Sequence, residues 1–317
     1  MPSSSTMPTV GFLCPCTLEL WKPWIDAFET QLGTHGWTKG TIDIDYQEAS
    51  GLKENYITSA KYFVSRKVDV IVTGGTQATL ACKEAAAKAK PSIPVVFGTA
   101  GDPVDTKLVP SYVQPGNLTG MSNQQTNLVI KRLDLVRLLL KFSTGKNKNR
   151  VGLVGNDQSP NVKLEMKIAK LVAPTLGLKL REGHIRKQKD IGPVIKGLKG
   201  KVDFLLVCTD PLITTNAIAL NAEAAKASLP TMHAFKEYLQ WGGFVSHGPK
   251  FEELFRNAAD MVDKILRGQA GLNMSNIPVG MTEDFETLIN LGPLGPFPSL
   301  GLTVPPSMLT LFDKVIR

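Results

Sequence analysis

The sequence predicts an α/β protein made of two lobes, each with a doubly wound parallel sheet. Two observations lead to this fold class. Short β-branched apolar runs alternate with amphipathic helical segments from residue 9 to residue 142, and the same alternation restarts at Arg150. Strands that alternate with helices form parallel sheets through right-handed crossovers. The restart therefore predicts two such units of similar size.

The segment 68–80 is the clearest strand–turn–helix unit. Its first half, 68–72, is a β-branched apolar run, as expected of a strand buried on both faces of a sheet. Gly74 and Gly75 then allow a tight turn, and Thr76 is predicted to cap the alanine-rich helix that follows. Such a turn leaves backbone N–H groups at the carboxyl edge of the sheet, where open α/β sheets bind ligands.

In the first half of the chain, the strands are predicted at 9–13, 42–46, 68–72, 93–97 and 117–122, and the helices at 18–32, 53–66, 76–88 and 125–142. The segment 98–104 is predicted as a loop, because glycine and proline interrupt any period there. Apolar residues mark the buried faces of two helices. These residues are Ile57, Ala60, Tyr62 and Phe63 in one, and Leu128, Leu135, Leu138, Leu139 and Phe142 in the other.

In the second half, the strands are predicted at 150–154, 179–182, 203–208, 230–233 and 243–246, and helices at 189–198, 212–227 and 235–240. A further helix follows Ser159, with its apolar side formed by Leu164, Ile168, Leu171 and Val172. The segment 251–267 is the strongest amphipathic helix and is predicted to pack back on the first unit. The glycine- and proline-rich segment 278–317 holds one clear strand at 286–291, which suits a crossing strand followed by a terminal cap.

Composition and charge exclude several classes of protein. The 317 residues are 43% hydrophobic and 20% charged, as in a soluble globular protein. The net charge is +8, but the basic residues are spread out and no helix-turn-helix is present, so no nucleic-acid partner is predicted. No apolar run approaches the roughly 18 residues that cross a bilayer, so no stable membrane insertion is predicted. Residues 1–8 lack the apolar core of a signal peptide, which fits either a cytoplasmic protein or a secreted one without its leader.

No motif predicts catalysis, a metal site or a cofactor. The sequence has no GxSxG elbow, P-loop, kinase signature or GxGxxG after a strand. The pair Cys14 and Cys16 would need two more ligands at suitable spacing to hold a metal. Asp102, Asp157 and Asp210 lie at predicted strand ends, but no histidine, lysine or metal partner is readable beside them.

Binding suits the strand ends better than catalysis. Helix N-termini with hydroxyl groups hold a carboxylate, aspartates hold an ammonium group, and aromatic rings cover an apolar group. The candidate ligand-binding residues of the first unit are Thr17, Trp21, Gly75, Thr76, Gln77, Thr99 and Asp102, and those of the second are Asn156, Ser159, Thr209, Asp210, Phe235 and Tyr238. The alternative is that Thr76 and Thr209 are only helix caps. The recurrence of these groups at one edge of both units favours binding.

Within these candidates, three roles are predicted. Thr76 and Gln77 bind a carboxylate, and Asp102 and Asp210 bind polar or cationic groups. The apolar part of the ligand is covered by aromatic side chains, which are Trp21, Phe235 and Tyr238.

Several runs carry a resemblance to a known family. In chain order they are VDVIVTGGT (68–76), PVVF (94–97), GDPV (101–104), PGNLTG (115–120), KRL (131–133), TDP (209–211), GG (242–243), SHGP (246–249), VDKILRG (262–268) and LGLTVPPS (300–307). On these runs, which span nearly the whole chain, the sequence resembles the ABC transporter substrate-binding protein family of the type I periplasmic-binding fold. That family is similar to proteins that carry tryptophan or other amino acids to an importer.

The resemblance implies two lobes joined by a hinge with three crossings, 1–119 plus 247–280 and 120–246 plus 281–317, which close on a small solute in the cleft between them. It also implies a membrane permease of an ABC importer as the partner, and a periplasmic or outer-surface location from which the leader has been removed. The expected function is that of an extracytoplasmic solute-binding protein without enzymatic activity. The expected ligand is an amino acid, with aromatic amino acids among the candidates. The loop 14–19 departs from the family in its cysteines.

Two other functions stay open on the same fold. A cytoplasmic ligand-sensing regulator would need a DNA-binding headpiece, and the eight residues before the first strand are too few to form one. A small-molecule enzyme that uses the strand-end aspartates would turn over its ligand, which mass spectrometry detects.

Overall fold

The computed structural model describes residues 7–141, 148–268, 276–292, 300 and 304–317. The chain forms two compact units, Met1–Gln124 with Phe251–Thr282 and Gln125–Lys250 with Glu283–Arg317. The predicted α/β class with two parallel-dominated sheets is confirmed. The chain passes from one unit to the other after Gln124, Lys250 and Thr282. The boundaries of the predicted lobes lie a few residues earlier, inside three strands that each belong to a single unit. Of the predicted positions, Phe142 and 301–303 lie outside the described residues.

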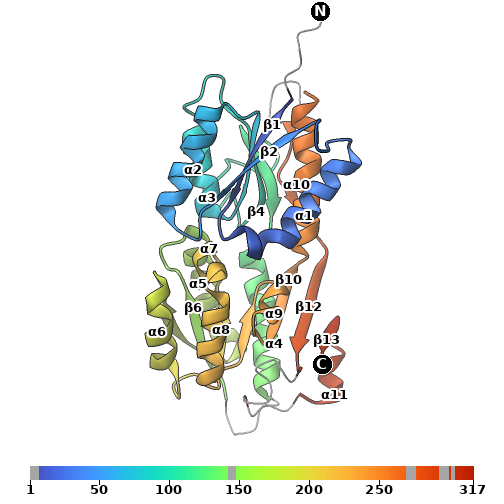
Figure 1. The fold of residues 1–317 in the computed structure, drawn as a ribbon. Helices are drawn as coiled ribbons and strands as arrows, with labels where there is room; N and C mark the ends of the chain where they lie inside the picture. Colours follow the sequence, from blue (N-terminus) through green and yellow to red (C-terminus); the bar gives the residue numbers. More distant parts are fainter. Residues whose placement is uncertain (1–6, 142–147, 269–275, 293–299, 301–303) are drawn as a thin grey trace, which may run out of the picture. The chain divides into compact units, whose positions relative to one another are not determined.

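The first unit is a six-stranded parallel sheet with helices on both faces (Figure 1). Its strands, in the order β11-β5-β4-β3-β1-β2, are β1 (Thr9–Cys14), β2 (Asp43–Glu48), β3 (Val70–Gly74), β4 (Val95–Ala100), β5 (Leu118–Ser122) and β11 (Gly280–Met281). The helices are α1 (Leu18–Thr34), α2 (Lys53–Arg66), α3 (Thr76–Ala86) and α10 (Phe251–Leu266).

Successive residues of β1 show why the helices divide between the two faces of this sheet. A Cβ atom at Gly11 would lie 2.7 Å from the ring of Phe63 on α2. The next residue, Phe12, points the other way, and its ring centroid lies 5.4 Å from Phe28 of α1 and 6.4 Å from Phe255 of α10. Because side chains alternate along a strand, α2 covers one face, and α1 and α10 cover the other. The predicted return of α10 to the first unit is confirmed.

The second unit repeats the arrangement with seven strands (Figure 1). In the order β13-β12-β10-β9-β8-β6-β7, they are β6 (Arg150–Gly155), β7 (Lys179–His184), β8 (Phe204–Val207), β9 (Thr231–His233), β10 (Val245–Pro249), β12 (Phe285–Asn290) and β13 (Lys314–Ile316). All neighbours pair in parallel except β10 and β12. Five strands follow the same order in both units, β5-β4-β3-β1-β2 in the first and β10-β9-β8-β6-β7 in the second. Each unit therefore has a topological switch point at the carboxyl ends of its strands.

The helices of the second unit are α4 (Gln125–Lys141), α5 (Pro160–Val172), α6 (Ile191–Leu198), α7 (Pro211–Thr215), α8 (Ala217–Lys226), α9 (Glu237–Gln240) and α11 (Pro306–Leu309), with 3-10 helices at Ala173–Leu176 and Gln188–Asp190. One apolar core lies under α4 and α5, and a second lies under α6 and α8. The prediction of a single helix over 212–227 is wrong, because the segment divides at Asn216 into two helices, α7 and α8.

Two predicted helix faces and one predicted loop are also wrong. On α2, Ile57 and Tyr62 are each 38% exposed. The buried face of this helix carries Tyr56, Ala60 and Phe63 instead. On α5, Leu171 is 64% exposed. The predicted loop 98–104 begins later, since β4 continues to Ala100, where its backbone pairs with β5.

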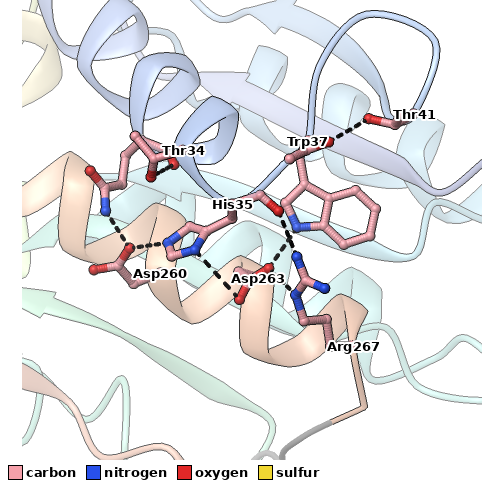
Figure 2. A network of polar contacts seen from close by, with 9 residues as sticks. Thr34, His35, Trp37, Thr41, Asp260, Asp263 and Arg267 are labelled. Atoms are coloured by element: carbon pink, nitrogen blue, oxygen red, sulfur yellow. Dashed lines mark hydrogen bonds and ion pairs between the residues drawn. The ribbon is translucent and has the colours of Figure 1, made fainter.

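The carboxyl-terminal ends of α1 and α10 are joined by a polar network (Figure 2). His35 Nε2 lies 2.6 Å from Asp260 Oδ1. Asp263 accepts hydrogen bonds from Trp37 Nε1 at 2.7 Å and from Arg267 Nε at 2.5 Å. Burial raises the pKa of Asp263, but the hydrogen bonds from Arg267 and Trp37 outweigh it, so the pKa lies below the ordinary aspartate value. The ionised carboxylate therefore stabilises the folded unit.

Replacing Asp263 by asparagine is expected to lower the free energy of unfolding by about 1–2 kcal/mol at pH 7. Because the folded pKa is depressed, this contribution is present above the unfolded pKa of about 4 and is lost as the pH falls through the folded value. Urea unfolding at pH 7 and pH 3 measures the difference between wild type and variant, which should shrink at pH 3. The control is Asp26→Asn on α1, whose ion pair with Lys22 is exposed, with an expected loss below about 0.5 kcal/mol. Equal losses at pH 7 in the two variants would contradict the role of Asp263.

Candidate functional site

In the first unit, an indole ring lies over the strand ends of the parallel sheet. β3 ends at Gly74, and a Cβ atom there would lie 2.4 Å from Trp21 Cη2 and 3.2 Å from Thr99 Cγ2. The side chains of Trp21 on α1 and Thr99 on β4 therefore both contact the Gly74 position. The backbone N–H of Gly75 donates to the Thr99 carbonyl at 2.6 Å. We call Trp21, Gly74, Gly75, Thr76 and Thr99 the first rim.

Three polar atoms of the first rim are buried and have no hydrogen-bond partner within the described part of the chain. They are Trp21 Nε1, Thr76 Oγ1 and Thr99 Oγ1, on residues that are 4%, 1% and 4% exposed. Buried polar atoms are nearly always paired in folded proteins, and an unpaired one costs about 1–3 kcal/mol. Three such atoms in the first rim leave hydrogen-bonding capacity that the described residues do not use.

The predicted cap of α3 is wrong. The N-cap residue is Gly75, with a φ of 76°, and Thr76 is the first helical residue. Glycine adopts this left-handed backbone without steric cost, which explains the turn between β3 and α3. Since no side chain among the described residues caps α3, its first-turn N–H groups remain available to an anion at the positive end of the helix dipole.

The other predicted residues of the first unit lie at the same strand ends. Thr17 is the N-cap of α1, where its Oγ1 accepts a hydrogen bond from the Leu20 N–H at 3.4 Å. Gln77 is half-buried in the first turn of α3. Asp102 follows β4 with a φ of 40° and is 4% exposed. A buried aspartate held in the left-handed region is typical of functional sites.

In the second unit, a hydrogen bond joins the residues that follow β6 and β8. Asn156 Nδ2 donates to Asp210 Oδ2 at 2.7 Å, and Asp210 Oδ1 accepts from the Ile213 N–H at 2.9 Å as the N-cap of α7. Burial raises the pKa of Asp210 to about 6, against the lowering effect of these hydrogen bonds. The neighbouring Thr209 Oγ1 is buried and finds no hydrogen-bond partner in the described ranges. We call Asn156, Ser159, Thr209 and Asp210 the second rim.

The two predicted aromatic residues of the second unit pack into a ring cluster. Phe235 and Tyr238 have ring centroids 4.5 Å apart, and Tyr238 stacks on His233 at 4.4 Å. The Tyr238 hydroxyl is hydrogen-bonded to Thr214 Oγ1 at 2.9 Å, and that hydroxyl also lies 3.0 Å from the Asp210 carbonyl. Hydrogen bonds through Thr214 therefore join the ring cluster to the backbone of the second rim.

Sequence reasoning missed a buried polar network in the second unit. Arg132 of α4 and Glu165 of α5 form an ion pair at 3.2 Å, and the two residues are 1% and 0% exposed. A signal was present in the sequence, because Arg132 lies four residues after Leu128 on the predicted apolar side of its helix. A charge on a stripe that packs into the core needs a buried partner, since an unpaired buried charge is strongly destabilising.

With this geometry in place, comparison with known proteins identifies the family. The sequence matches the family described as ABC transporter substrate binding protein over residues 25–316. The chain belongs to this family. Its members are substrate-binding proteins and not enzymes, and the resemblance noted in the sequence is confirmed.

Individual relatives of this ABC transporter substrate-binding protein agree. A tyrosine-binding protein from Clostridioides difficile (strain R20291) is 28% identical over 250 residues, which are 78% of this chain and 68% of that protein. A conserved domain protein from Vibrio cholerae has a TM-score of 0.87 at 25% identity, covering 98% of this chain and 100% of that one. An ABC domain from Streptococcus pneumoniae in complex with L-Trp has a TM-score of 0.86 at 21% identity, with the same coverage, and shows the shared fold.

The described residues of this substrate-binding protein contain no group of three or more histidine, cysteine, aspartate or glutamate side chains placed to hold a metal ion. All four cysteines are buried, and none forms a disulfide in the ranges described. Among the helices of those ranges, none combines the length and apolar composition needed to cross a membrane.

Proposed function

We propose that this substrate-binding protein is an extracytoplasmic receptor that binds an aromatic amino acid and presents it to the membrane permease of an ABC importer. The observation that carries the proposal is the first rim, beside the N-terminus of α3, where three buried polar atoms, one of them on the Trp21 ring, have no hydrogen-bond partner in the described part of the chain. The tyrosine-binding relative and the L-Trp complex of a structural neighbour support this ligand class.

The first rim supplies groups for the carboxylate and the ring of such a ligand. Thr76 Oγ1 and the first-turn N–H groups of α3 donate to the carboxylate, with Gln77 beside them. The Trp21 ring packs against the aromatic side chain of the ligand. Trp21 Nε1 and Thr99 Oγ1 form hydrogen bonds with polar substituents on that side chain.

The ammonium group is assigned to Asp102 in preference to Asp210. Asp102 follows β4 at the strand ends where the first rim lies, whereas Asp210 belongs to the second unit. A micromolar affinity needs only about 8 kcal/mol net, which a few charge-assisted hydrogen bonds and one buried ring supply after the costs of association.

A thermal-shift series tests the ligand class, because a ligand that binds only the folded protein raises its unfolding midpoint. L-tyrosine and L-tryptophan are expected to raise the midpoint, while L-alanine and glucose leave it unchanged. Tyramine lacks the carboxylate and 3-(4-hydroxyphenyl)propionate lacks the ammonium group, so both should be weaker than L-tyrosine. The proposal fails if no aromatic amino acid shifts the midpoint, or if tyramine matches L-tyrosine.

Replacing Thr76 by valine is expected to weaken L-tyrosine binding by roughly ten- to a hundredfold, because a hydrogen bond to a charged group contributes about 1.5–3 kcal/mol. Valine keeps the branched shape, and the lost hydroxyl has no described partner within the protein, so the folded state should keep its stability. Isothermal titration calorimetry measures the affinity. Thr58→Val on the exposed side of α2 is the matched control and should bind as the wild type does. If Thr76→Val bound L-tyrosine as tightly as the wild type, Thr76 would have no role in ligand binding.

A further inference from the structure

The excess positive charge of the chain belongs to one segment of the second unit. Basic residues occur along the whole sequence, but the segment 148–203 holds 13 lysine and arginine residues against five aspartate and glutamate residues. Its net charge is +8, which equals that of the whole chain, and the remaining 261 residues hold 23 of each sign. The segment forms β6, α5, β7 and α6, at one end of the seven-stranded sheet.

Each of the five acidic side chains in this segment has a partner inside the protein. The ion pairs are Asp157–Arg186 at 2.7 Å, Glu182–Lys170 at 2.7 Å, Asp203–Arg150 at 2.6 Å and Glu165–Arg132 at 3.2 Å. Asp190 accepts hydrogen bonds from the backbone N–H groups of Arg186 and Lys187 at 3.0 and 3.1 Å. These carboxylates are therefore not available to neutralise the other basic residues of the segment.

Six exposed basic side chains of the segment form no ion pair in the described part of the chain. We call them the basic edge. They are Lys163 and Lys167 on α5, Lys179 and Arg181 on β7, and Lys196 and Lys199 at the end of α6.

Two contacts place these six residues around the outer strand of the sheet. β7 is the last strand in the sheet order. On one face of β7, Lys170 of α5 reaches Glu182, so the other two lysines on that side of α5 follow the strand. On the other face, a Cβ atom at Gly183 would lie 2.7 Å from Val194 Cγ1 of α6. Basic groups from two helices and from the strand between them therefore flank one edge of the second unit.

Protection of the outer strand explains only part of this surface. Charged residues on such a strand prevent edge-to-edge pairing of sheets, which accounts for Lys179 and Arg181. The lysines of α5 and α6 have no such role, because helices do not pair in this way. Leu171 is 64% exposed and lies on α5 four residues after Lys167, on the same side of the helix. An exposed leucine beside lysines is typical of helices that lie on a bilayer surface.

The composition of the segment favours a lipid surface over nucleic acid or a single bound phosphate. The segment 148–203 contains no phenylalanine, tryptophan or tyrosine that could stack on bases. Five of the six residues of the basic edge are lysines, which are compact point charges without the planar fork with which arginine binds a phosphate. Spread lysines suit the diffuse negative field of anionic headgroups, where each contributes about fivefold in affinity.

We propose that the basic edge is a membrane-docking surface, which holds the second unit against a layer of anionic lipid headgroups. The attachment is reversible and electrostatic, and no part of the chain enters the hydrocarbon. It weakens as salt is added, because ions screen exposed charges. This surface uses none of the residues proposed to bind the amino acid, and it needs no ligand.

The test is sedimentation of the full chain with lipid vesicles, without added amino acid. At about 0.05 M salt, the wild type is expected to bind vesicles with about 30% phosphatidylglycerol in phosphatidylcholine, to leave pure phosphatidylcholine vesicles unbound, and to dissociate at about 0.5 M salt. A variant that neutralises four lysines of the basic edge should bind at least about a hundredfold more weakly. Its substitutions are Lys163→Gln, Lys167→Gln, Lys196→Gln and Lys199→Gln.

The matched control removes the same amount of charge from exposed lysines of the first unit. Its substitutions are Lys53→Gln, Lys61→Gln, Lys88→Gln and Lys264→Gln. The control should bind the anionic vesicles within about twofold of the wild type. Because all eight side chains are exposed, both variants should keep the unfolding midpoint of the wild type.

Three results would overturn the inference. The first is a wild type that does not sediment with the anionic vesicles, or that binds pure phosphatidylcholine equally well. The second is an equal loss in the two variants, because net charge and not the basic edge would then be responsible. The third is binding of poly-L-glutamate without binding of vesicles, which would indicate an acidic protein as the partner. None of these results changes the affinity for L-tyrosine, so the inference and the proposed function fail separately.

Discussion

Replacing Arg132 by methionine is expected to lower the free energy of unfolding of the second unit by about 3–5 kcal/mol, the usual cost of removing one partner of a buried ion pair. Methionine fills much of the same volume, but Glu165 would then remain inside the core without the guanidinium. The His247 carbonyl would lose its donor as well. Urea unfolding followed by tryptophan fluorescence and circular dichroism measures the loss and shows whether the two units unfold together.

Two further variants decide whether charge is the cause. In the background of Arg132→Met, the change Glu165→Gln removes the unpaired carboxylate and should restore most of the lost stability. Arg186→Met is the matched control in the same unit, because Arg186 pairs with Asp157 at the surface and is 55% exposed. Its expected cost is below about 1 kcal/mol. If the control lost as much as Arg132→Met, or if Glu165→Gln added to the damage, the buried charge would not explain the effect.

The sequence was sufficient to predict most of the fold, because hydrophobic period and glycine turns are local signals. Helix 53–66 has the bounds of α2, and helix 125–142 begins at the first residue of α4. The repeat of the strand–helix alternation was enough to predict two sheets. A hydrophobic period is less able to show which residues lie on the buried face of a helix. This explains why Leu171 is predicted on the buried face of α5 although it is exposed.

The site was harder to predict, because its chemistry depends on long-range contacts. Thr76 looked like a cap, yet the chain turns at Gly75 and leaves the Thr76 hydroxyl buried and unpartnered in the described structure. Asp210 looked like a carboxylate for an ammonium group, yet Asn156 on another strand end already binds it. No spacing rule connects positions 156 and 210, so only a folded structure shows which polar groups satisfy one another.

Replacing Gly74 by alanine is expected to weaken the binding of aromatic amino acids by at least about tenfold. The added Cβ atom would lie 2.4 Å from Trp21 Cη2 and 3.1 Å from Trp21 Cζ3, far inside van der Waals contact. The ring cannot stay where it is, and its Nε1 moves with it. Overpacking of this kind costs about 1–3 kcal/mol, and the side chain that it displaces is the one proposed to pack against the ligand. Calorimetry with L-tyrosine and L-tryptophan measures the change.

The effect of Gly74→Ala should act through Trp21, and a second cycle establishes this. Trp21→Leu removes the bulk that the new methyl group would strike, so adding Gly74→Ala to Trp21→Leu should cause no further loss of affinity. Gly197→Ala in α6 is the matched control, because a Cβ atom there meets nothing within 4 Å, and its binding should equal that of the wild type. Multiplied losses in the cycle would mean that Gly74 matters for another reason, such as the geometry of the β3–α3 turn. Unchanged affinity in Gly74→Ala would instead place the ligand away from the Trp21 ring, and the first rim would no longer support the proposed function.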